Sequence, residues 1–248
     1  MKSQLGSSNI HTLPEAGRKE RDGKTCEACP VRETSMCAAL SDTRLEVLDA
    51  AASRHSFDPD ETILFESDPA DFAFNLTEGV ARVSKMLPDG RRQITGFLHP
   101  GDFLGLSYQD CYAYSAEAVT TVKVCRFRKA ELNRIMRDHP DLEHRLLSMA
   151  SNELALAHDR MLLLGRKSAA EKVASFLLSL PRKEERIDEI DLPMTRGDIA
   201  DYLGLTLETV SRTLSGFVRQ QIVRNATPRI IVVLDMARLS ALAAGEGR

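Results

Sequence analysis

The sequence predicts an α+β protein in which an N-terminal β-roll is followed by a long helix and a C-terminal winged helix-turn-helix. Three observations indicate this order. Short apolar runs separated by turn residues fill the chain from about Ser56 to Arg128, as expected of a small sandwich or barrel. Apolar residues then recur at helical spacing over residues 140–165. Two short helical patterns finally flank Gly204, where a tight turn between helices needs a residue that tolerates positive φ.

The composition is that of an ordinary globular protein. The chain has 248 residues, 43% of them hydrophobic and 28% charged, which suffices for two domains. No apolar run approaches the roughly 18 residues of a membrane span, and the polar N-terminus lacks the core of a signal peptide. We therefore expect a cytoplasmic protein with no membrane contact. Because the net charge is −3, any contact with nucleic acid has to come from a local patch.

The texture of the sequence divides the chain into four parts. Residues 1–24 are polar and charged without periodicity, which predicts a disordered tail. A cysteine-rich segment and the β-roll follow over 25–139, the long helix over 140–166, and the winged helix-turn-helix over 167–248. Within the roll, "MLPDGRRQITGF" predicts a hairpin loop between two strands.

One face of the predicted long helix is apolar. Its members recur at steps of three and four, which puts them on one stripe: Leu146, Ala150, Leu154, Ala157, Met161 and Leu164. So narrow a stripe needs a partner. The helix can pack on its own sheets, or it can pair with a second copy as a parallel coiled coil. The second interpretation predicts a homodimer with these side chains at the interface.

The segment "TRGDIADYLGLTLETVSRTLSGFVRQQ" predicts the helix-turn-helix. Thr195 and Asp198 form a capping box at the start of the first helix. Gly204 lies in the turn, and Thr206 can cap the second helix. Two short helices joined by a short glycine turn are the pattern of a helix-turn-helix. The sequence "IVRNATPRIIVVLD" then predicts a β-hairpin wing.

The exposed face of the second helix predicts contacts with double-stranded DNA. In a helix-turn-helix this face enters the major groove. Arg can grip guanine by two parallel hydrogen bonds, and Glu can accept from cytosine, so we expect base contacts from Glu208, Ser211 and Arg212. Residues near helix N-termini are suited to phosphate. The expected backbone contacts are Thr195, Arg196, Thr206 and Thr209.

Three of the five cysteines lie in "TCEACPVRETSMC". A disulfide, a metal site and chance are the alternatives, and a reducing cytosol favours metal ligands or redox centres over structural disulfides. Zinc accepts four thiolates, and redox sensing by thiols without metal is also open. Along "VTTVKVCRF", Val122 and Val124 share one strand face, so Cys125 can point away from the core of the roll.

The order of these parts resembles the CRP/FNR superfamily of bacterial transcription regulators. "QITGFLHPGDFLGL", "MLLLGRKSAAEKVASFL" and "MTRGDIADYLGLTLETVSR" resemble its FNR branch, the oxygen-responsive regulators, and the resemblance covers about residues 25–240. It implies a cyclic-nucleotide-binding-like jelly roll, RNA polymerase as a partner, and a palindromic operator with TTGAT-type half-sites in inverted repeat.

The resemblance also implies one [4Fe–4S] cluster in each subunit. The ligands that match the pattern of the branch are Cys26, Cys29, Cys37 and Cys125. The seven-residue gap before Cys37 is longer than in some members and resembles an alphaproteobacterial variant. By this resemblance the cluster promotes dimerisation and DNA binding at low oxygen, and its loss in oxygen inactivates the protein. Cys111 is interpreted as a small hydrophobic residue, with ligation in place of Cys125 as the alternative.

Two other interpretations are weaker. Cyclic-nucleotide binders of the superfamily have an acidic residue and an Arg-Ser pair where this chain has Leu106 and Tyr114-Ser115. A buried phosphate without its Arg partner is costly, so we do not expect a cyclic nucleotide, although another small ligand in the roll stays an alternative. The sequence has no acid/base constellation or Gly-rich nucleotide loop, so we predict that the protein is not an enzyme.

Overall fold

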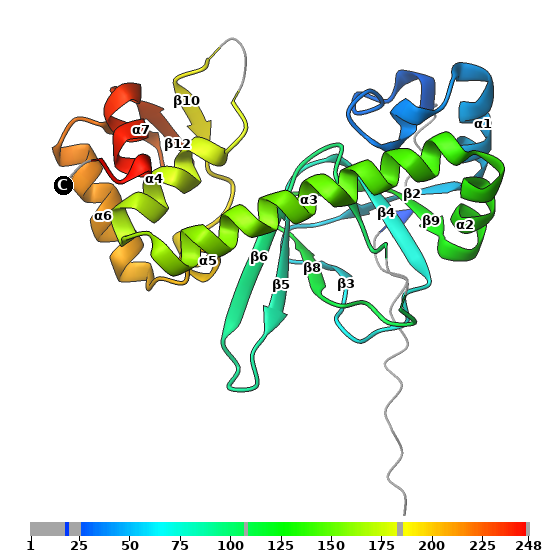
Figure 1. Cartoon of the computed structure of the whole chain (residues 1–248), viewed down its shortest axis with the longest axis horizontal. Helices are drawn as coiled ribbons and strands as arrows, with labels where there is room; N and C mark the ends of the chain where they lie inside the picture. Colours follow the sequence, from blue (N-terminus) through cyan, green and yellow to red (C-terminus); the bar gives the residue numbers. More distant parts are fainter. Residues whose placement is uncertain (1–17, 20–25, 107–108, 183–185, 247–248) are drawn as a thin grey trace, which may run out of the picture.

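The computed structural model describes residues 18–19, 26–106, 109–182 and 186–246. A β-roll and a smaller C-terminal domain lie at different places along one long helix, α3 (Pro140–Arg166), which crosses the molecule (Figure 1). The predicted disordered tail, 1–24, lies outside the described residues except for Arg18–Lys19. These two residues form strand β1 and pair with the first strand of the roll. The predicted α+β fold with its three parts is confirmed.

The roll consists of two antiparallel sheets. One has the order β1 (Arg18–Lys19), β2 (Ala52–Phe57), β9 (Val122–Arg128), β4 (Phe72–Glu78) and β7 (Phe103–Leu104). The other has the order β3 (Thr62–Leu64), β8 (Ser115–Ala118), β5 (Ala81–Met86) and β6 (Arg92–Leu98). Strands β5 and β6 form the predicted hairpin. The core of the roll includes Phe57, Leu76 and Val124.

A second core lies on the outer side of the five-stranded sheet. The thiol segment, defined as residues 26–40, forms two short 3-10 helices, η1 (Cys26–Ala28) and η2 (Met36–Ala39). Helices α1 (Asp42–Ala51) and α2 (Lys129–Asp138) pack beside it. The buried side chains here include Met36, Leu48, Phe127 and Leu142. This core therefore joins the thiol segment to the roll and to the start of α3.

The C-terminal domain is a small helical unit with a three-stranded sheet. It contains α4 (Ala169–Ser179), α5 (Arg196–Leu203), α6 (Leu207–Arg219) and α7 (Met236–Ala244). Its sheet has the order β10 (Glu189–Asp191), β12 (Ile230–Val233) and β11 (Val223–Thr227), of which β11 and β12 form the wing. Ile199, Val210 and Phe217 lie in its core. None of the helices in the described part of the chain is both long and apolar enough to cross a membrane.

Two glycines in turns of the roll offer a matched test of local packing. Gly79 and Gly90 share φ +86°, but a Cβ on Gly79 would lie 2.2 Å from the Thr121 carbonyl oxygen, whereas a Cβ on Gly90 would meet nothing within 4 Å. Gly90→Ala should therefore cost about 1 kcal/mol from backbone strain alone. Gly79→Ala should cost at least about 2 kcal/mol more because the turn has to move. Chemical unfolding of both variants measures the difference, and equal losses would contradict it.

Candidate nucleic-acid interface and thiol cluster

The helix-turn-helix has the local chemistry that the sequence predicts. Thr195 caps α5, accepting from the Asp198 N–H at 3.0 Å, while the Asp198 carboxylate accepts from the Thr195 N–H at 3.0 Å. Gly204 ends α5 in the left-handed region, at φ 61°. Thr206 caps α6 by accepting from the Thr209 N–H at 3.1 Å. These caps fix where each helix begins, and so fix which face of α6 is exposed.

The exposed face of α6 forms a shallow hollow, which we call the reading face. It is lined by Glu208, Ser211, Arg212, Ser215 and Arg219. Arg212 forms an ion pair with Glu208 across one helical turn, with Nη2 and Oε1 2.6 Å apart, and both side chains are largely exposed. The pair therefore holds an Arg and a Glu side by side toward solvent. The three predicted base-contacting residues all belong to this face.

The reading face also has a neighbour that sequence reasoning missed. Leu207, the first residue of α6, is 57% exposed although it is apolar. An apolar side chain at the edge of a groove-reading helix can contact a thymine methyl group. The sequence did contain a signal for this contact. Leu207 lies between the Thr206 cap and Glu208, on an exposed first turn where a polar residue would be expected.

The four predicted phosphate contacts are not equivalent. The hydroxyls of Thr206 and Thr209 lie 2.9 Å apart on the exposed first turn of α6. The Thr195 hydroxyl is already used, since it donates to the Asp198 carboxylate at 2.7 Å. Arg196 is half-buried, which lowers its pKa, and its Nη1 is buried with no hydrogen-bond partner among the described residues. This atom would gain a partner if the side chain turned toward an anion.

The apolar seam of α3 starts one residue later than predicted. Leu146 is buried in the core beside the thiol segment, so its assignment to an exposed dimer face is wrong. Leu147 is 67% exposed and continues the alternating steps of three and four. The corrected seam, called the α3 seam below, is Leu147, Ala150, Leu154, Ala157, Met161 and Leu164.

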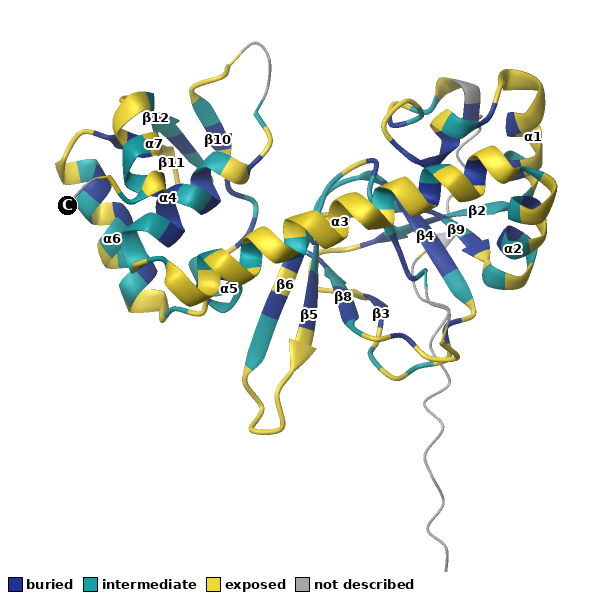
Figure 2. Cartoon of the chain, viewed as in Figure 1, coloured by how far each residue is buried: buried dark blue, intermediate teal, exposed yellow. Residues whose placement is uncertain are grey.

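This seam is largely exposed. Figure 2 shows that α3 is largely exposed along its length, and its buried residues, Leu142 and Leu146, lie near its beginning. Leu154 is 59% and Met161 62% exposed. The corrected seam follows a strict heptad, the pattern of a coiled-coil dimer. The helix therefore has one end packed within its own protomer and an apolar stripe without cover from the described residues.

The thiol segment folds as a series of tight turns. The Cys29 N–H donates to the Cys26 carbonyl at 3.4 Å, and the Ser35 hydroxyl caps η2 by accepting from the Cys37 N–H at 3.2 Å. Ser35 is fully buried. These turns bring Cys26 and Cys37 into one core with Cys125 from β9. The alternation along β9 explains this, because Val122 and Val124 fill the roll while Cys125 faces outward.

The four thiols lie within electrostatic reach of one another. The charges of Cys37 and Cys125 raise the pKa of Cys26, and the charge of Cys29 raises the pKa of Cys125. Cys111 does not belong to this group: it is exposed and pairs by an isolated bridge with Pro69 on another side of the roll. The structure thus brings together the four predicted ligands and separates the fifth cysteine from them.

Two arginines border the thiols: Arg32, whose charge opposes the effect of burial on the pKa of Cys37, and Arg54. Arg54 donates to the Asp49 carboxylate at 2.6 Å, and the same nitrogen lies 3.9 Å from the Cys26 sulfur. Burial alone would raise the pKa of Asp49, but its hydrogen bonds with Arg54 and Cys26 hold it below the usual value. Asp49 in turn accepts from the Cys26 thiol at 3.2 Å. An Arg at this place offsets negative charge that develops on the sulfurs.

Burial keeps the thiols of Cys26, Cys37 and Cys125 protonated in the absence of metal. It raises the pKa of Cys125 to about 12, and it raises the pKa values of Cys26 and Cys37 as well. A thiol with a raised pKa is a poor nucleophile because the thiolate is the reactive form. Within the described ranges, no three His, Cys, Asp or Glu side chains converge as a site for one metal ion.

Two tyrosines pack in or against the core of the roll and use their hydroxyl groups within it. The Gly105 N–H donates to the Tyr114 hydroxyl at 3.0 Å. The Tyr112 hydroxyl accepts from the Phe72 N–H at 3.2 Å and donates to the Phe72 carbonyl at 2.8 Å. Burial raises the pKa of both tyrosines, that of Tyr112 to about 12. The backbone N–H of Gly105 is thus already hydrogen-bonded to a side chain of the roll, that of Tyr114.

Comparison with known proteins agrees with this architecture. The chain matches the cyclic nucleotide-binding domain over residues 54–139 and the Crp-like helix-turn-helix domain over residues 171–242. The nitrogen fixation regulation protein FixK of Bradyrhizobium diazoefficiens is 43% identical, covering 91% of this chain and 96% of its own. The transcriptional activator protein FnrL of Cereibacter sphaeroides is 37% identical, covering 86% and 90%. The structure of FixK2 from Bradyrhizobium japonicum is 40% identical, with a TM-score of 0.72, covering 77% of this chain and 96% of that one.

A β-roll, a long helix and a winged helix with an exposed reading face define a DNA-binding transcription regulator. The relatives are regulators of the same kind, and none of those reported above is named as an enzyme. The chain belongs to the CRP/FNR superfamily. The prediction that the protein is not an enzyme is confirmed by this membership.

Thiol burial predicts a clear order of chemical reactivity. At neutral pH, Cys125 with its pKa near 12 has about a thousandfold less thiolate than a cysteine with the ordinary value of 9.0. In metal-free protein under nitrogen, a maleimide should therefore modify exposed Cys111 long before Cys26, Cys37 or Cys125. Peptide mass spectrometry over time measures the order. Equal labelling of Cys111 and Cys125 in folded protein would contradict the described burial.

Proposed function

We propose that this protein is an oxygen-responsive transcription regulator that binds one [4Fe–4S] cluster per subunit through Cys26, Cys29, Cys37 and Cys125. The observation that carries the proposal is the convergence of the thiol segment and β9 on one core. Four thiolates are the ligand set that such a cluster requires. The DNA target implies that the protein works in the cytoplasm.

The donor set and its surroundings fit this cofactor. When bound, the cluster supplies a redox-active inorganic core whose properties depend on charge, hydrogen bonds and solvent access. Arg54 offsets the charge of the thiolates, and Met36 and Leu48, both fully buried, keep water from them. A single zinc ion, which also accepts four thiolates, is the alternative that iron and sulfide analysis separates from the cluster. Sensing by thiols alone is disfavoured by the raised pKa values of Cys26, Cys37 and Cys125.

The thiol segment is joined directly to α3. Arg145 donates to the Thr34 carbonyl at 2.9 Å and to the Ser35 carbonyl at 3.4 Å. Leu142 and Leu146 of α3 pack in the same core as Met36. An ordered thiol segment therefore holds the beginning of α3 in place. We expect an ordered segment at low oxygen to favour pairing along the α3 seam, and a released segment in oxygen to favour separate protomers.

Pairing of two protomers would present two reading faces to one operator. Two recognition helices about 34 Å apart enter successive major grooves and read an inverted repeat, for which the expected half-site is of the TTGAT type. In each half-site we assign base contacts to Glu208, Ser211 and Arg212, with Leu207 as an apolar contact. The phosphate contacts are Thr206, Thr209 and Arg196, with a lesser part for Thr195, whose hydroxyl already bonds Asp198.

RNA polymerase is the expected protein partner, by resemblance to the family. The tip of the β5–β6 hairpin is a candidate contact because Met86 is 55% and Leu87 40% exposed there. Cyclic nucleotides are not expected as ligands. Their phosphate would compete with Tyr114 for the Gly105 N–H, and Tyr114 brings no positive charge to offset the phosphate.

The fourth ligand can be tested with a matched pair of variants. Cys125→Ser should lose the bound iron and sulfide of protein purified without air, and should lose specific operator binding, because one of four thiolates is missing. Cys111→Ser should keep both, since Cys111 lies apart from the other thiols. Iron and sulfide analysis and a gel-shift titration before and after exposure to air provide the readouts. Wild-type protein without iron that still binds its palindrome, in air and without it, would contradict the proposal.

The reading face makes a second test possible. Arg212→Ala should weaken operator binding by roughly 1–3 kcal/mol and relax the preference at one base pair, because a bidentate base contact is lost. Arg134→Ala, on the exposed surface of α2, is the control and should bind normally. Titration against operators substituted at each position measures the preference. A uniform loss over all sequences would assign Arg212 to phosphate instead.

A further inference from the structure

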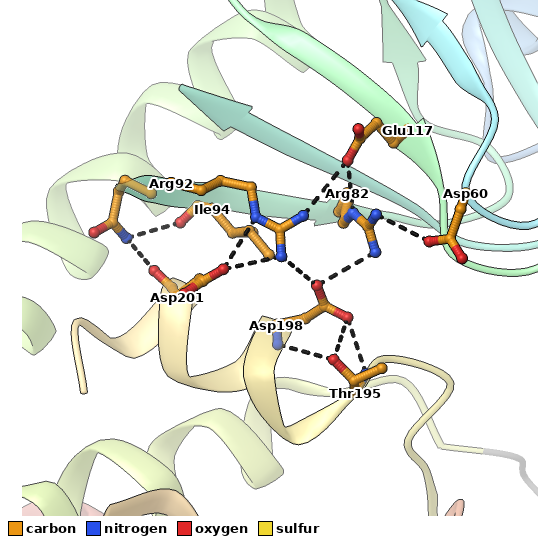
Figure 3. A network of polar contacts seen from close by, with 9 residues as sticks. Asp60, Arg82, Arg92, Ile94, Glu117, Thr195, Asp198 and Asp201 are labelled. Carbon is orange, nitrogen blue, oxygen red and sulfur yellow. Dashed lines mark hydrogen bonds and ion pairs between the residues drawn. The ribbon is translucent and has the colours of Figure 1, made fainter. Parts of the chain in front are cut away.

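Strands β5 and β6 contact α5 through a buried carboxylate, that of Asp198. Asp198 is only 2% exposed. Its Oδ1 accepts from Arg92 at 2.8 Å and from Arg82 at 3.3 Å, and its Oδ2 accepts from Thr195 (Figure 3). The two arginines belong to the roll, while Asp198 and Thr195 belong to the DNA-binding domain. One carboxylate therefore caps α5 and also joins the two domains.

Further carboxylates complete this group, which we call the interdomain network. Arg82 also donates to Glu117 at 2.8 Å and to Asp60 at 3.0 Å, and its side chain is 11% exposed. Arg92 also pairs with Asp201 at 2.9 Å. Burial by itself would lower the pKa of Arg82, but the surrounding carboxylates raise it above the usual value. The Arg82 guanidinium therefore stays charged.

Strand β6 makes two more contacts with the same helix. The Gln93 amide donates to the Asp201 carbonyl at 2.6 Å, so it satisfies a backbone group at the end of α5. The Phe97 ring packs against Tyr202 with a centroid distance of 5.4 Å and against Phe176 at 6.1 Å. The roll thus holds α5 by charges at its start and by polar and apolar contacts at its end.

The network lies outside the core of the DNA-binding domain. That core is built from residues of its own domain, and from the roll only the partly buried Phe97 and Val119 pack against it. The domain can therefore keep its packing when an arginine of the roll is removed. What changes is the charge balance of Asp198, because a buried carboxylate that loses a cation is left uncompensated. The interdomain network therefore affects how the roll and the DNA-binding domain are arranged, and not whether each of them folds.

We propose that Arg82 and Arg92 are positioning residues for DNA binding, which act through Asp198 and Asp201 to hold the reading face in one orientation relative to the roll and α3. The path is short: α5 packs directly on α6 within one core, through Ala200 and Val210. A displacement of α5 therefore moves the reading face. In a dimer, two such displacements alter the separation and angle of the two recognition helices.

The test compares neighbouring arginines of one hairpin. Arg92→Ala removes ion pairs with α5, whereas Arg91→Ala removes an exposed arginine whose ion pair is with Asp89 at the hairpin tip. Both full-length variants are purified without air and titrated against two palindromes, one with the preferred half-site spacing and one with a spacing longer by one base pair. The ratio of the two affinities measures how firmly the reading faces are held.

We expect Arg92→Ala to lose about tenfold in affinity for the preferred operator, within the range of typical coupling between sites. Its preference for the correct spacing should fall toward one, because a loosely held domain adapts to both operators. Arg91→Ala should match the wild type in both respects. Arg92→Ala with full affinity and full spacing preference would overturn the proposal, as would equal effects in the two variants.

A double-variant cycle tests whether Arg92 acts through α5. Asp201→Ala removes one partner, and the combined variant R92A/D201A should lose little more than R92A alone, because the same contact is already broken. Fully additive losses would contradict the proposed path. Arg92→Lys keeps one charge and should recover part of the spacing preference. No recovery by Lys together with a matching fall in the thermal midpoint would make Arg92 a purely structural residue.

The spacing measurement rests on the proposed dimer, so iron content and sedimentation are measured on the same samples. Wild-type protein that lacks iron or stays monomeric contradicts the proposed function. If wild-type and R92A proteins have the same iron content, the same dimer formation and the same DNA binding, the proposed role of the interdomain network is contradicted instead. The two failures are therefore distinguishable within one set of preparations.

Discussion

The alternation of side chains along β9 is the constraint on which the arrangement depends. Val122 and Val124 fill the roll, while Cys125 and Phe127 face the opposite side of the same strand. A shift of one residue in the pairing of this strand would exchange the two sets. The outer set forms the core in which the thiol segment, α1, α2 and the beginning of α3 meet. A chemical event at the sulfurs therefore occurs in a core shared with the long helix.

Helix α3 connects two environments. One face of its beginning packs in the core with the thiol segment, and its remaining length of several turns exposes an apolar stripe. At 1.5 Å per residue, its 27 residues span about 40 Å. Near its end, Leu164 lies 3.7 Å from the place where a Cβ of Gly204 would be. One rigid element thus reaches from the thiols to the turn of the helix-turn-helix, and Arg160, which donates to the Thr95 carbonyl at 3.0 Å, fixes it to β6 on the way.

Local chemistry made much of this predictable from the sequence. The capping box of Thr195 and Asp198, the left-handed Gly204 and the outward direction of Cys125 depend on neighbouring residues, so a pattern suffices to find them. The predicted start of the α3 seam was wrong because Leu146 and Leu147 are adjacent, and both lie three or four residues before Ala150. Only the packing of the thiol segment decides which one is buried. The interdomain network joins residues more than a hundred positions apart, and no periodicity relates them.

The hydrogen bond from Gly105 to Tyr114 bears on how a fold shared with nucleotide receptors can answer a different signal. Gly105 donates its backbone N–H to the Tyr114 hydroxyl, so this donor is already satisfied within the roll. A roll in which this donor is satisfied needs no bound ligand to complete its hydrogen bonding, so it can serve as a structural support. On the proposed function, the response would then arise on the outer side of the sheet, where the thiol segment packs in one core with Cys125 of β9.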